Sequence, residues 1–209
     1  MGKRLWILLL LIIAVFAGVV WADRGSKAVE AGAEDGTPPV HIIGKQDATV
    51  KLVEYSDFQC AACAAYYPIV EQVIEKYKDK ISFEYRHYPL TTIHRNAFAA
   101  ARASEAADKQ GKFWEMYRLL FSNQSAWENS SNAQSVFESY AGQLGLDPAK
   151  FKADFTSKGT NSAINASIAE FNTRGLPKAT PTFLLNDKKI EPRSVEDFSK
   201  LIDEQLGTL

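Results

Sequence analysis

The sequence predicts an α/β domain whose first strand and first helix meet at a pair of cysteines. A β-branched and aromatic pattern at 49–57 is followed by apolar residues at three- and four-residue spacing over 60–78, and a second strand pattern follows at 80–88. This order of strand, helix and strand predicts a βαβ unit with two parallel strands. The two cysteines of the chain, Cys60 and Cys63, lie where the first strand pattern gives way to the helical one.

The first 22 residues have the pattern of a membrane leader. Residues 1–4 include the basic pair Lys3 and Arg4, and 5–22 form an unbroken apolar run. As a helix this run would be about 27 Å long, close to the thickness of the hydrocarbon core of a bilayer. We expect an uncleaved transmembrane signal anchor with 1–4 in the cytoplasm, and a signal peptide cleaved near Ala22 is the alternative.

Residues 23–40 join this leader to the domain at 41–209. They contain several Gly and Pro and few large apolar side chains, which is typical of a flexible linker. Export through the leader would place the cysteines outside the cytoplasm, where disulfides form and persist. Basic and acidic residues are nearly balanced, 24 against 25, which gives no indication of nucleic-acid binding.

The middle of the domain, about 92–175, has helical rather than strand patterns. The expected helices are 95–109, 112–122, 133–144, 148–157 and 161–173, with Gly111, Gly145, Gly159 and Gly175 at their ends. Two short strands at 182–185 and 188–191 then predict a hairpin around Asn186-Asp187, and a last helix is expected at 195–206.

The position of the cysteines predicts dithiol redox chemistry. Cys60 is expected at the N-terminus of the first helix, where unpaired N–H groups and the helix dipole favour its thiolate and lower its pKa from the free value of about 8.5. Cys63, one turn later on the same helix face, is expected to be more buried and to act as the resolving thiol. A three-residue offset in a helix also brings the two Cα atoms within disulfide range.

Two other interpretations of the pair are less favoured. A purely structural disulfide would close a very small loop, which removes little entropy from the unfolded chain. A zinc site needs about four ligands, and the spacing of the two cysteines and His41, His87 and His94 matches no standard zinc motif. We therefore expect a redox pair, with neither a metal nor another cofactor. His87 and His94 are expected to be packing or polar residues rather than catalytic ones.

Four motifs together resemble the family of DsbA-like thioredoxin-fold thiol-disulfide oxidoreductases. They are VEYSDFQCAAC at 53–63, YRHYPL at 85–90, GKFWEMY at 111–117 and TPTFLLN at 180–186. The resemblance extends over most of residues 40–209. It implies a thioredoxin fold, βαβ then ββα, interrupted by an inserted helical subdomain at about 92–175.

The resemblance also implies roles for three residues besides the cysteines. Pro181 is expected to follow a cis peptide bond and to face the cysteine pair, while the backbone of Thr180 pairs with an extended substrate; a proline that only starts a strand is the alternative. Glu54 is expected to be a buried carboxylate with a raised pKa that exchanges a proton with Cys63 through water. Its alternative is a solvated side chain at a strand end.

The expected function is an extracytoplasmic oxidase that donates a Cys60-Cys63 disulfide to exported proteins with free thiols and is reset by a membrane redox partner. Ala61 and Ala62 separate the cysteines, where the family often has proline, histidine or an aromatic residue. Because alanine offers the Cys60 thiolate no hydrogen bond or charge from its side chain, the direction of electron flow stays open. A disulfide reductase or isomerase is one alternative, and a thiol-dependent holdase or assembly factor is an alternative of another class.

Overall fold

The computed structural model describes residues 37–207, which fall within one compact unit of the chain, Gly32–Leu209. The expected leader at 5–22 and residues 23–36 of the expected linker at 23–40 lie outside the described residues. Among residues 37–207, the structure contains no helix with both the length and the apolar character needed to cross a membrane.

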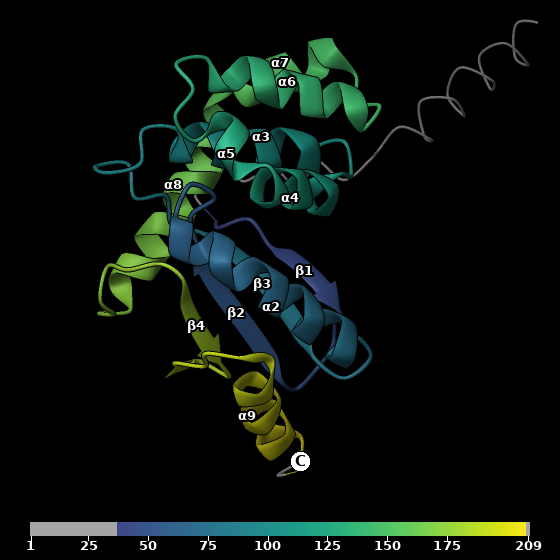
Figure 1. The fold of residues 1–209 in the computed structure, drawn as a ribbon, viewed down its shortest axis with the longest axis vertical. Coiled ribbons are helices and arrows are strands. Elements are labelled where there is room, and N and C mark those ends of the chain that lie inside the picture. The colour runs from purple at the N-terminus through teal and green to yellow at the C-terminus, as the bar shows by residue number, and fades with distance from the viewer. Residues whose placement is uncertain (1–36, 208–209) are drawn as a thin grey trace, which may run out of the picture. The chain divides into compact units, whose positions relative to one another are not determined.

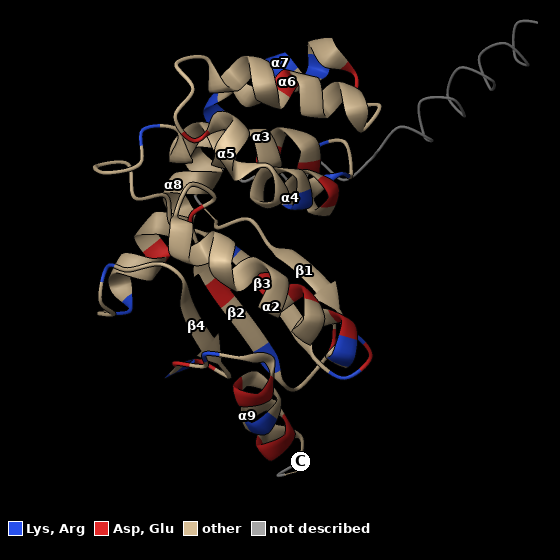
Figure 2. Ribbon diagram, viewed as in Figure 1, with Lys and Arg blue, Asp and Glu red and all other residues tan. Residues whose placement is uncertain are grey.

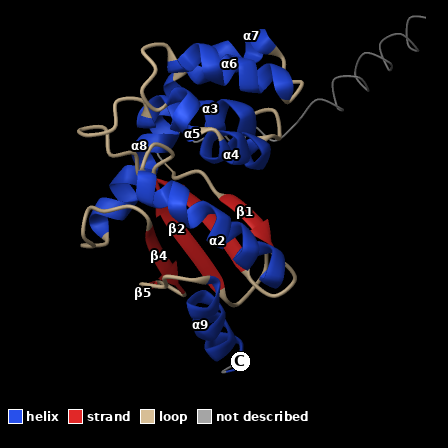
Figure 3. Ribbon diagram, in the orientation of Figure 1, coloured by secondary structure: helices blue, strands red, loops and turns tan. Residues whose placement is uncertain are grey.

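A mixed five-stranded sheet forms the centre of this unit (Figure 3), in the order β1-β3-β2-β4-β5. The strands are β1 His41–Gly44, β2 Lys51–Ser56, β3 Ser82–His87, β4 Thr182–Leu185 and β5 Lys188–Ile190. β2 and β3 are parallel and are connected by α2, Ala61–Tyr77, whereas β1, β4 and β5 each pair antiparallel with their neighbours. The predicted α/β class and the βαβ unit are therefore confirmed.

The two faces of the sheet carry different layers. Alternate residues of β2, among them Glu54, face α2 and α9, Val195–Gly207, and share a large core with them. The intervening residues of β2, which include Tyr55, face the helix α8, Lys158–Thr173. The ring of Tyr55 lies 4.8 Å from that of Phe171 in this helix. Because β2 is the middle strand, its side chains are covered on both faces.

A block of helices connects β3 to β4 and lies together at one end of the strands (Figure 1). It consists of α3 Ala97–Asp108, α4 Phe113–Ser122, α5 Gln124–Trp127, α6 Ala133–Gln143, α7 Pro148–Phe155 and α8. Large aromatic side chains such as Trp127, Phe137 and Phe151 are fully buried within it, in a core continuous with that of α2 and the sheet. The block thus packs directly against the helix that carries the cysteines.

Most predicted turns are present. Asn186 and Asp187 have φ values of 47° and 64°, as a two-residue hairpin turn requires. Gly111, Gly145 and Gly175 follow helix ends with positive φ. The prediction was wrong for Gly159, which lies in the first turn of α8.

The start of α8 has a local cause. The hydroxyl of Ser157 accepts a hydrogen bond from the backbone N–H of Thr160 at 3.1 Å, so Ser157 caps the helix three residues earlier than predicted.

Two elements were not predicted. The helix α5 is one turn long, and β1 has four residues that pair antiparallel with β3 at the edge of the sheet. The strand β1 ends at Gly44, whose φ is 94° and where an added Cβ would lie 2.6 Å from the carbonyl oxygen of Ile81. Glycine is thus required for the chain to pass this close to the residues before β3.

Candidate active site

The turn between β2 and α2 places the two cysteines as the sequence predicts. Cys60 is the N-cap residue of α2, with φ −72° and ψ 125°, and Cys63 lies in the first turn. Both are free thiols, and the exposed fraction of the residue is 8% for Cys60 and 0% for Cys63. The first cysteine therefore borders the surface, and the second is enclosed behind it.

The local hydrogen bonds separate the pKa values of the two thiols. A hydrogen bond from the Cys63 thiol, helped by the backbone N–H groups of Cys63 and Ala62, lowers the pKa of Cys60 to about 5, although burial acts in the opposite direction. Burial raises the pKa of Cys63 well above its usual value, and the charges of Cys60 and Glu54 raise it further. At neutral pH Cys60 is thus a thiolate and Cys63 a thiol, the states that a nucleophile and a resolving group need.

A buried aspartate fastens the turn before Cys60. One carboxylate oxygen of Asp57 accepts a hydrogen bond from the backbone N–H of Gln59 at 2.7 Å. The other accepts from the backbone N–H of Leu90 at 2.9 Å and from Nδ1 of His94 at 2.7 Å. The side chain of Asp57 is fully buried, so it ties the active-site turn to the loop that follows β3.

The helical block fastens the same turn from the other side. The amide of Gln124 donates to the carbonyl oxygens of Phe58 at 2.8 Å and Cys60 at 3.2 Å. The side chain of Gln59 donates to the carbonyl oxygen of Glu128 and accepts from the backbone N–H of Asn96, both at 2.7 Å. The inserted helices therefore hold the backbone of the turn that carries Cys60 in a defined position. The sequence pattern indicates no role for Gln59, Asn96 and Gln124, because the partners of their side chains are 31 or more positions away.

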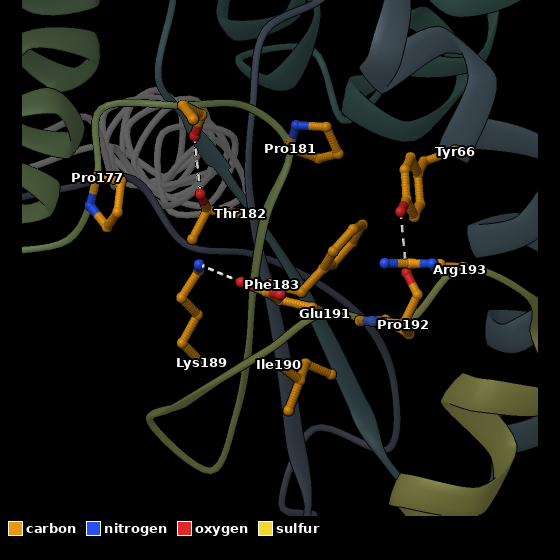
Figure 4. A pocket seen from close by; sticks show the side chains of 11 residues that line it. Tyr66, Pro177, Pro181, Thr182, Phe183, Lys189, Ile190, Glu191, Pro192 and Arg193 are labelled. Atoms are coloured by element: carbon orange, nitrogen blue, oxygen red, sulfur yellow. Dashed lines mark hydrogen bonds and ion pairs between the residues drawn. The ribbon is translucent and has the colours of Figure 1, made fainter.

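The Thr180-Pro181 bond is cis, as predicted. The carbonyl oxygen of Thr180 lies 3.6 Å from Sγ of Cys60, so the loop before β4 faces the nucleophile. Beside this loop is a cavity of about 340 Å³ (Figure 4). Its lining includes Tyr66, Pro177, Pro181, Phe183, Pro192 and Arg193. An extended chain bound to the Thr180 backbone would pass next to this partly apolar cavity.

Glu54 is buried, as predicted, and the alternative of a solvated strand end is wrong. Glu54 is the acidic residue of β2, a strand in which Figure 2 shows a red segment, and its exposed fraction is 2%. Burial raises the pKa of Glu54 to about 7, although the nearby hydroxyl of Ser56 lowers it. The charge of Glu54 in turn raises the pKa of Cys63. The structure thus brings Glu54, Cys60, Cys63, Thr180 and Pro181 into one site; the catalytic part assigned to Glu54 stays a prediction.

The burial of Glu54 predicts a stability change with pH. Its pKa rises from 4.5 in the unfolded chain to about 7 in the folded one, so its protonated form stabilises the fold below pH 4.5 and this stabilisation is lost as pH rises through 7. In wild type the free energy of unfolding should fall by up to about 3 kcal/mol over this pH range, and we expect Glu54→Gln to remove this decrease. Urea unfolding of the oxidised proteins at pH 4.5 and 7.5 measures it, with the exposed Glu75→Gln as control. Equal pH dependence in wild type and Glu54→Gln would contradict the prediction.

Three buried side chains have the chemistry of metal ligands. One ligand atom from each of His41, His87 and Glu105 lies within 4.8 Å of the others. However, one oxygen of Glu105 already accepts hydrogen bonds from Nε2 of His41 at 2.6 Å and from Nε2 of His87 at 2.8 Å. Both nitrogens that face the carboxylate therefore carry protons rather than free lone pairs. We assign these residues to a buried ion pair and not to a metal site.

The charges in this cluster follow from its hydrogen bonds. Burial alone would lower the pKa of His41, but the Glu105 carboxylate and the nearby Asp108 raise it to about 9. Burial dominates at His87 and lowers its pKa, so this second imidazole is neutral. The two imidazoles outweigh burial at Glu105 and hold its pKa below its usual range. The expectation that His87 and His94 are packing or polar residues agrees with their contacts to Glu105 and Asp57.

Solved structures share the fold of this chain. The oxidised form of BdbD from Bacillus subtilis matches with a TM-score of 0.71 and 22% sequence identity, covering 82% of this chain and 94% of that one. The alpha-DsbA1 protein of Wolbachia pipientis matches with a TM-score of 0.71 and 21% identity, covering 82% and 92%. At these identities the likeness establishes the fold.

Sequence comparisons match the same region. The sequence profile of a family described as Thioredoxin matches residues 36–204. Among curated relatives, a Na(+)/H(+) antiporter NhaA 1 of Mycolicibacterium gilvum is 35% identical over 156 residues, covering 71% of this chain and 24% of that protein. A Na(+)/H(+) antiporter NhaA 3 of Salinispora tropica is 31% identical over 163 residues, covering 78% and 24%. The chain spans about a quarter of the length of these relatives.

Proposed function

The chain belongs to the thioredoxin family, with the fold of its DsbA-like members, and we propose that it donates a Cys60-Cys63 disulfide to exported proteins. The observation that carries this proposal is the lowered pKa of Cys60, about 5. A stabilised thiolate favours the reduced form of the pair, which makes the disulfide a stronger oxidant. The alanines at 61 and 62 therefore do not argue against an oxidase, because the Cys63 thiol and backbone N–H groups stabilise the thiolate.

The reaction uses the two thiols in order. A substrate thiolate attacks Sγ of Cys60, which breaks the Cys60-Cys63 bond and leaves the electron pair on Sγ of Cys63. Cys63 takes up a proton, and a second substrate thiolate then attacks the mixed disulfide. The substrate leaves with a disulfide, and Cys60 leaves as a stabilised thiolate.

Substrate binding would involve the backbone more than particular side chains. The carbonyl of Thr180 faces Cys60 and offers an edge on which an extended chain can form strand-like hydrogen bonds. The adjacent cavity combines the rings of Tyr66 and Phe183 with the charged side chains of Lys189 and Glu191 (Figure 4), which pair at 2.6 Å. Such a site accepts unfolded segments of varied sequence.

Location and partners follow from the same proposal. The apolar run at 5–22 would anchor the protein with its thioredoxin domain on the extracytoplasmic side, where client proteins gain their disulfides. An oxidase must be returned to its disulfide form after each cycle, so we propose a membrane redox partner that accepts the two electrons.

The reduction potential tests the proposal. Full-length protein is equilibrated with glutathione buffers, and the thiolate absorbance of the reduced protein is followed from pH 3 to 9. We expect Cys60 to ionise near pH 5 and the potential to lie above about −180 mV, toward the values of oxidases. A potential near about −270 mV, the value of thioredoxin itself, would overturn the oxidase proposal in favour of a reductase.

A further inference from the structure

A loop beside the nucleophile presents a basic and an apolar side chain to solvent. It consists of residues 89–96, between β3 and α3, and the backbone N–H of Asn96 fastens it to the side chain of Gln59 at 2.7 Å. Arg95 precedes Asn96 and is exposed. The exposed fraction of Ile93 is 72%. The loop therefore places a guanidinium and a large apolar side chain next to the turn that carries Cys60.

Two further basic side chains lie on the side of the Thr180 loop. The carbonyl oxygen of Thr180 is 3.6 Å from Sγ of Cys60, and the exposed Lys178 lies two residues earlier in the same loop. Arg193 is also exposed and lines the cavity of about 340 Å³ beside Pro181. Positive charges thus border the site on both sides. We call these side chains the basic rim: Arg95, Lys178 and Arg193.

The side chains of the basic rim are not held by partners within the protein. None of them makes a hydrogen bond or an ion pair among residues 37–207. The other arginines of this part of the chain each bond a side-chain oxygen: Arg86, Arg102, Arg118 and Arg174. A guanidinium offers five donors in a fork that matches a carboxylate. The donors of the rim are therefore available to a ligand.

Acidic side chains offset the basic rim only in part. Segments 58–62, 89–96 and 176–182, which border the nucleophile, contain no Asp or Glu. Asp57 is fully buried behind the turn, and Glu191 pairs with Lys189 at 2.6 Å. Glu128 and Asp197 also lie near the rim and weaken its field. Neither lies in the segments that border the nucleophile, so an incoming chain meets the basic side chains first.

A client would lie across the basic rim during the reaction. Its thiolate attacks Cys60 while its backbone pairs with Thr180, so the residues on either side of its cysteine extend over the neighbouring surface. An extended chain advances about 3.3 Å per residue, which keeps the first three residues on each side within about 10 Å of the nucleophile. Ala61 and Ala62 are exposed and carry no long side chain that would hold the client away.

We propose that the basic rim selects client segments in which acidic side chains flank the reactive cysteine. The inference rests on the proposed function and names the class of client that the site prefers. Carboxylates complement the fork of an arginine and the charge of a lysine, whereas basic segments are repelled. Acidic neighbours also raise the pKa of the client's own thiol in solution, and pairing with the rim removes this disadvantage when the thiol attacks.

The first test compares client charge. Full-length oxidised protein is mixed at pH 7 with three dithiol peptides that differ only in the residues next to each cysteine, which are aspartate, serine or lysine. Glutathione disulfide, mixed with the same peptides, measures the intrinsic reactivity of each thiol. After this correction we expect the aspartate peptide to react about tenfold faster than the lysine peptide at low salt. The difference should shrink severalfold at high salt, which screens exposed charges.

The second test reverses the charge of the rim. Arg95→Glu and Lys178→Glu should each lower the rate for the aspartate peptide and raise it for the lysine peptide, a gain that misfolding cannot produce. The matched control is Lys80→Glu, the same change at an exposed residue beyond the C-terminal end of α2. At 1.5 Å per residue that end is about 25 Å from Cys60, so the preference should not change.

The outcomes separate this inference from the proposed function. Equal corrected rates for the three peptides would overturn the selection by the basic rim and leave the oxidase standing. The same would follow from an unchanged preference in both Arg95→Glu and Lys178→Glu, or from an equal shift in Lys80→Glu. Wild-type protein that oxidises none of the three peptides would instead overturn the proposed function.

Discussion

Replacing Cys63 with alanine is expected to trap client proteins on Cys60. The first step leaves a mixed disulfide, and without Cys63 no thiol within the site can reverse it. In this variant the hydrogen bond from the Cys63 thiol is lost, but the backbone N–H groups at the start of α2 still favour the Cys60 thiolate, which reacts with client disulfides as they arise. Non-reducing gels of cells that express Cys63→Ala should show cysteine-linked adducts that disappear with a reductant.

The control for trapping is the companion variant Cys60→Ala. It should form no adducts and lose disulfide-exchange turnover by on the order of 10³-fold or more, as for the loss of other covalent nucleophiles. Cys63 cannot substitute, because it is fully buried and burial raises its pKa. Adducts in Cys60→Ala, or none in Cys63→Ala, would contradict the assignment of the two thiols.

The double variant Cys60→Ala/Cys63→Ala separates enzyme from holdase. A holdase that binds unfolded segments through the Thr180-Pro181 edge, with the cysteines only trapping clients, would still slow the aggregation of an unfolded client without either thiol. An oxidoreductase without either thiol would lose all disulfide exchange with the client and would not protect it from aggregation. The same client protein can be used to measure both aggregation and disulfide exchange, so the two results can be compared directly.

The sequence predicted the helices and strands in which apolar side chains recur at a regular spacing. The period-two pattern of β2 and β3 and the helical stripe of α2 arise from residues close together in sequence, and each is long enough to show its period. The hairpin turn at Asn186-Asp187 is similarly local. The placement of Cys60 at a helix N-terminus followed from these elements alone.

The sequence could not predict the contacts that surround the cysteines. His41 meets Glu105 across 64 positions, and Asp57 meets His94 across 37, so nothing in their spacing indicates a pair. The strand β1 has four residues and exists because β3 offers it a free edge. These features depend on how the helical block folds back on the sheet, which pattern and propensity do not specify.

One consequence of that packing is a large expected loss of stability in Glu105→Ala. The variant leaves His41 buried without its carboxylate partner, and breaking such a pair costs about 3–5 kcal/mol. The matched control is Glu115→Ala, which removes a partly exposed carboxylate paired with Lys112 at 2.7 Å and should cost at most about 1 kcal/mol. Urea unfolding of the oxidised proteins at pH 6 measures both values.

The pH dependence of this loss identifies His41 as its source. The pKa of His41 rises from 6.5 in the unfolded chain to about 9 in the folded one, so the pair contributes fully below pH 6.5 and its contribution is lost as pH rises through 9. Wild type should therefore lose up to about 3 kcal/mol across this range, and Glu105→Ala much less. The two proteins should differ clearly at pH 6 and only slightly at pH 10. A difference that is the same at both values would mean that Glu105 stabilises the fold by packing, since a neutral contact does not respond to the protonation of His41.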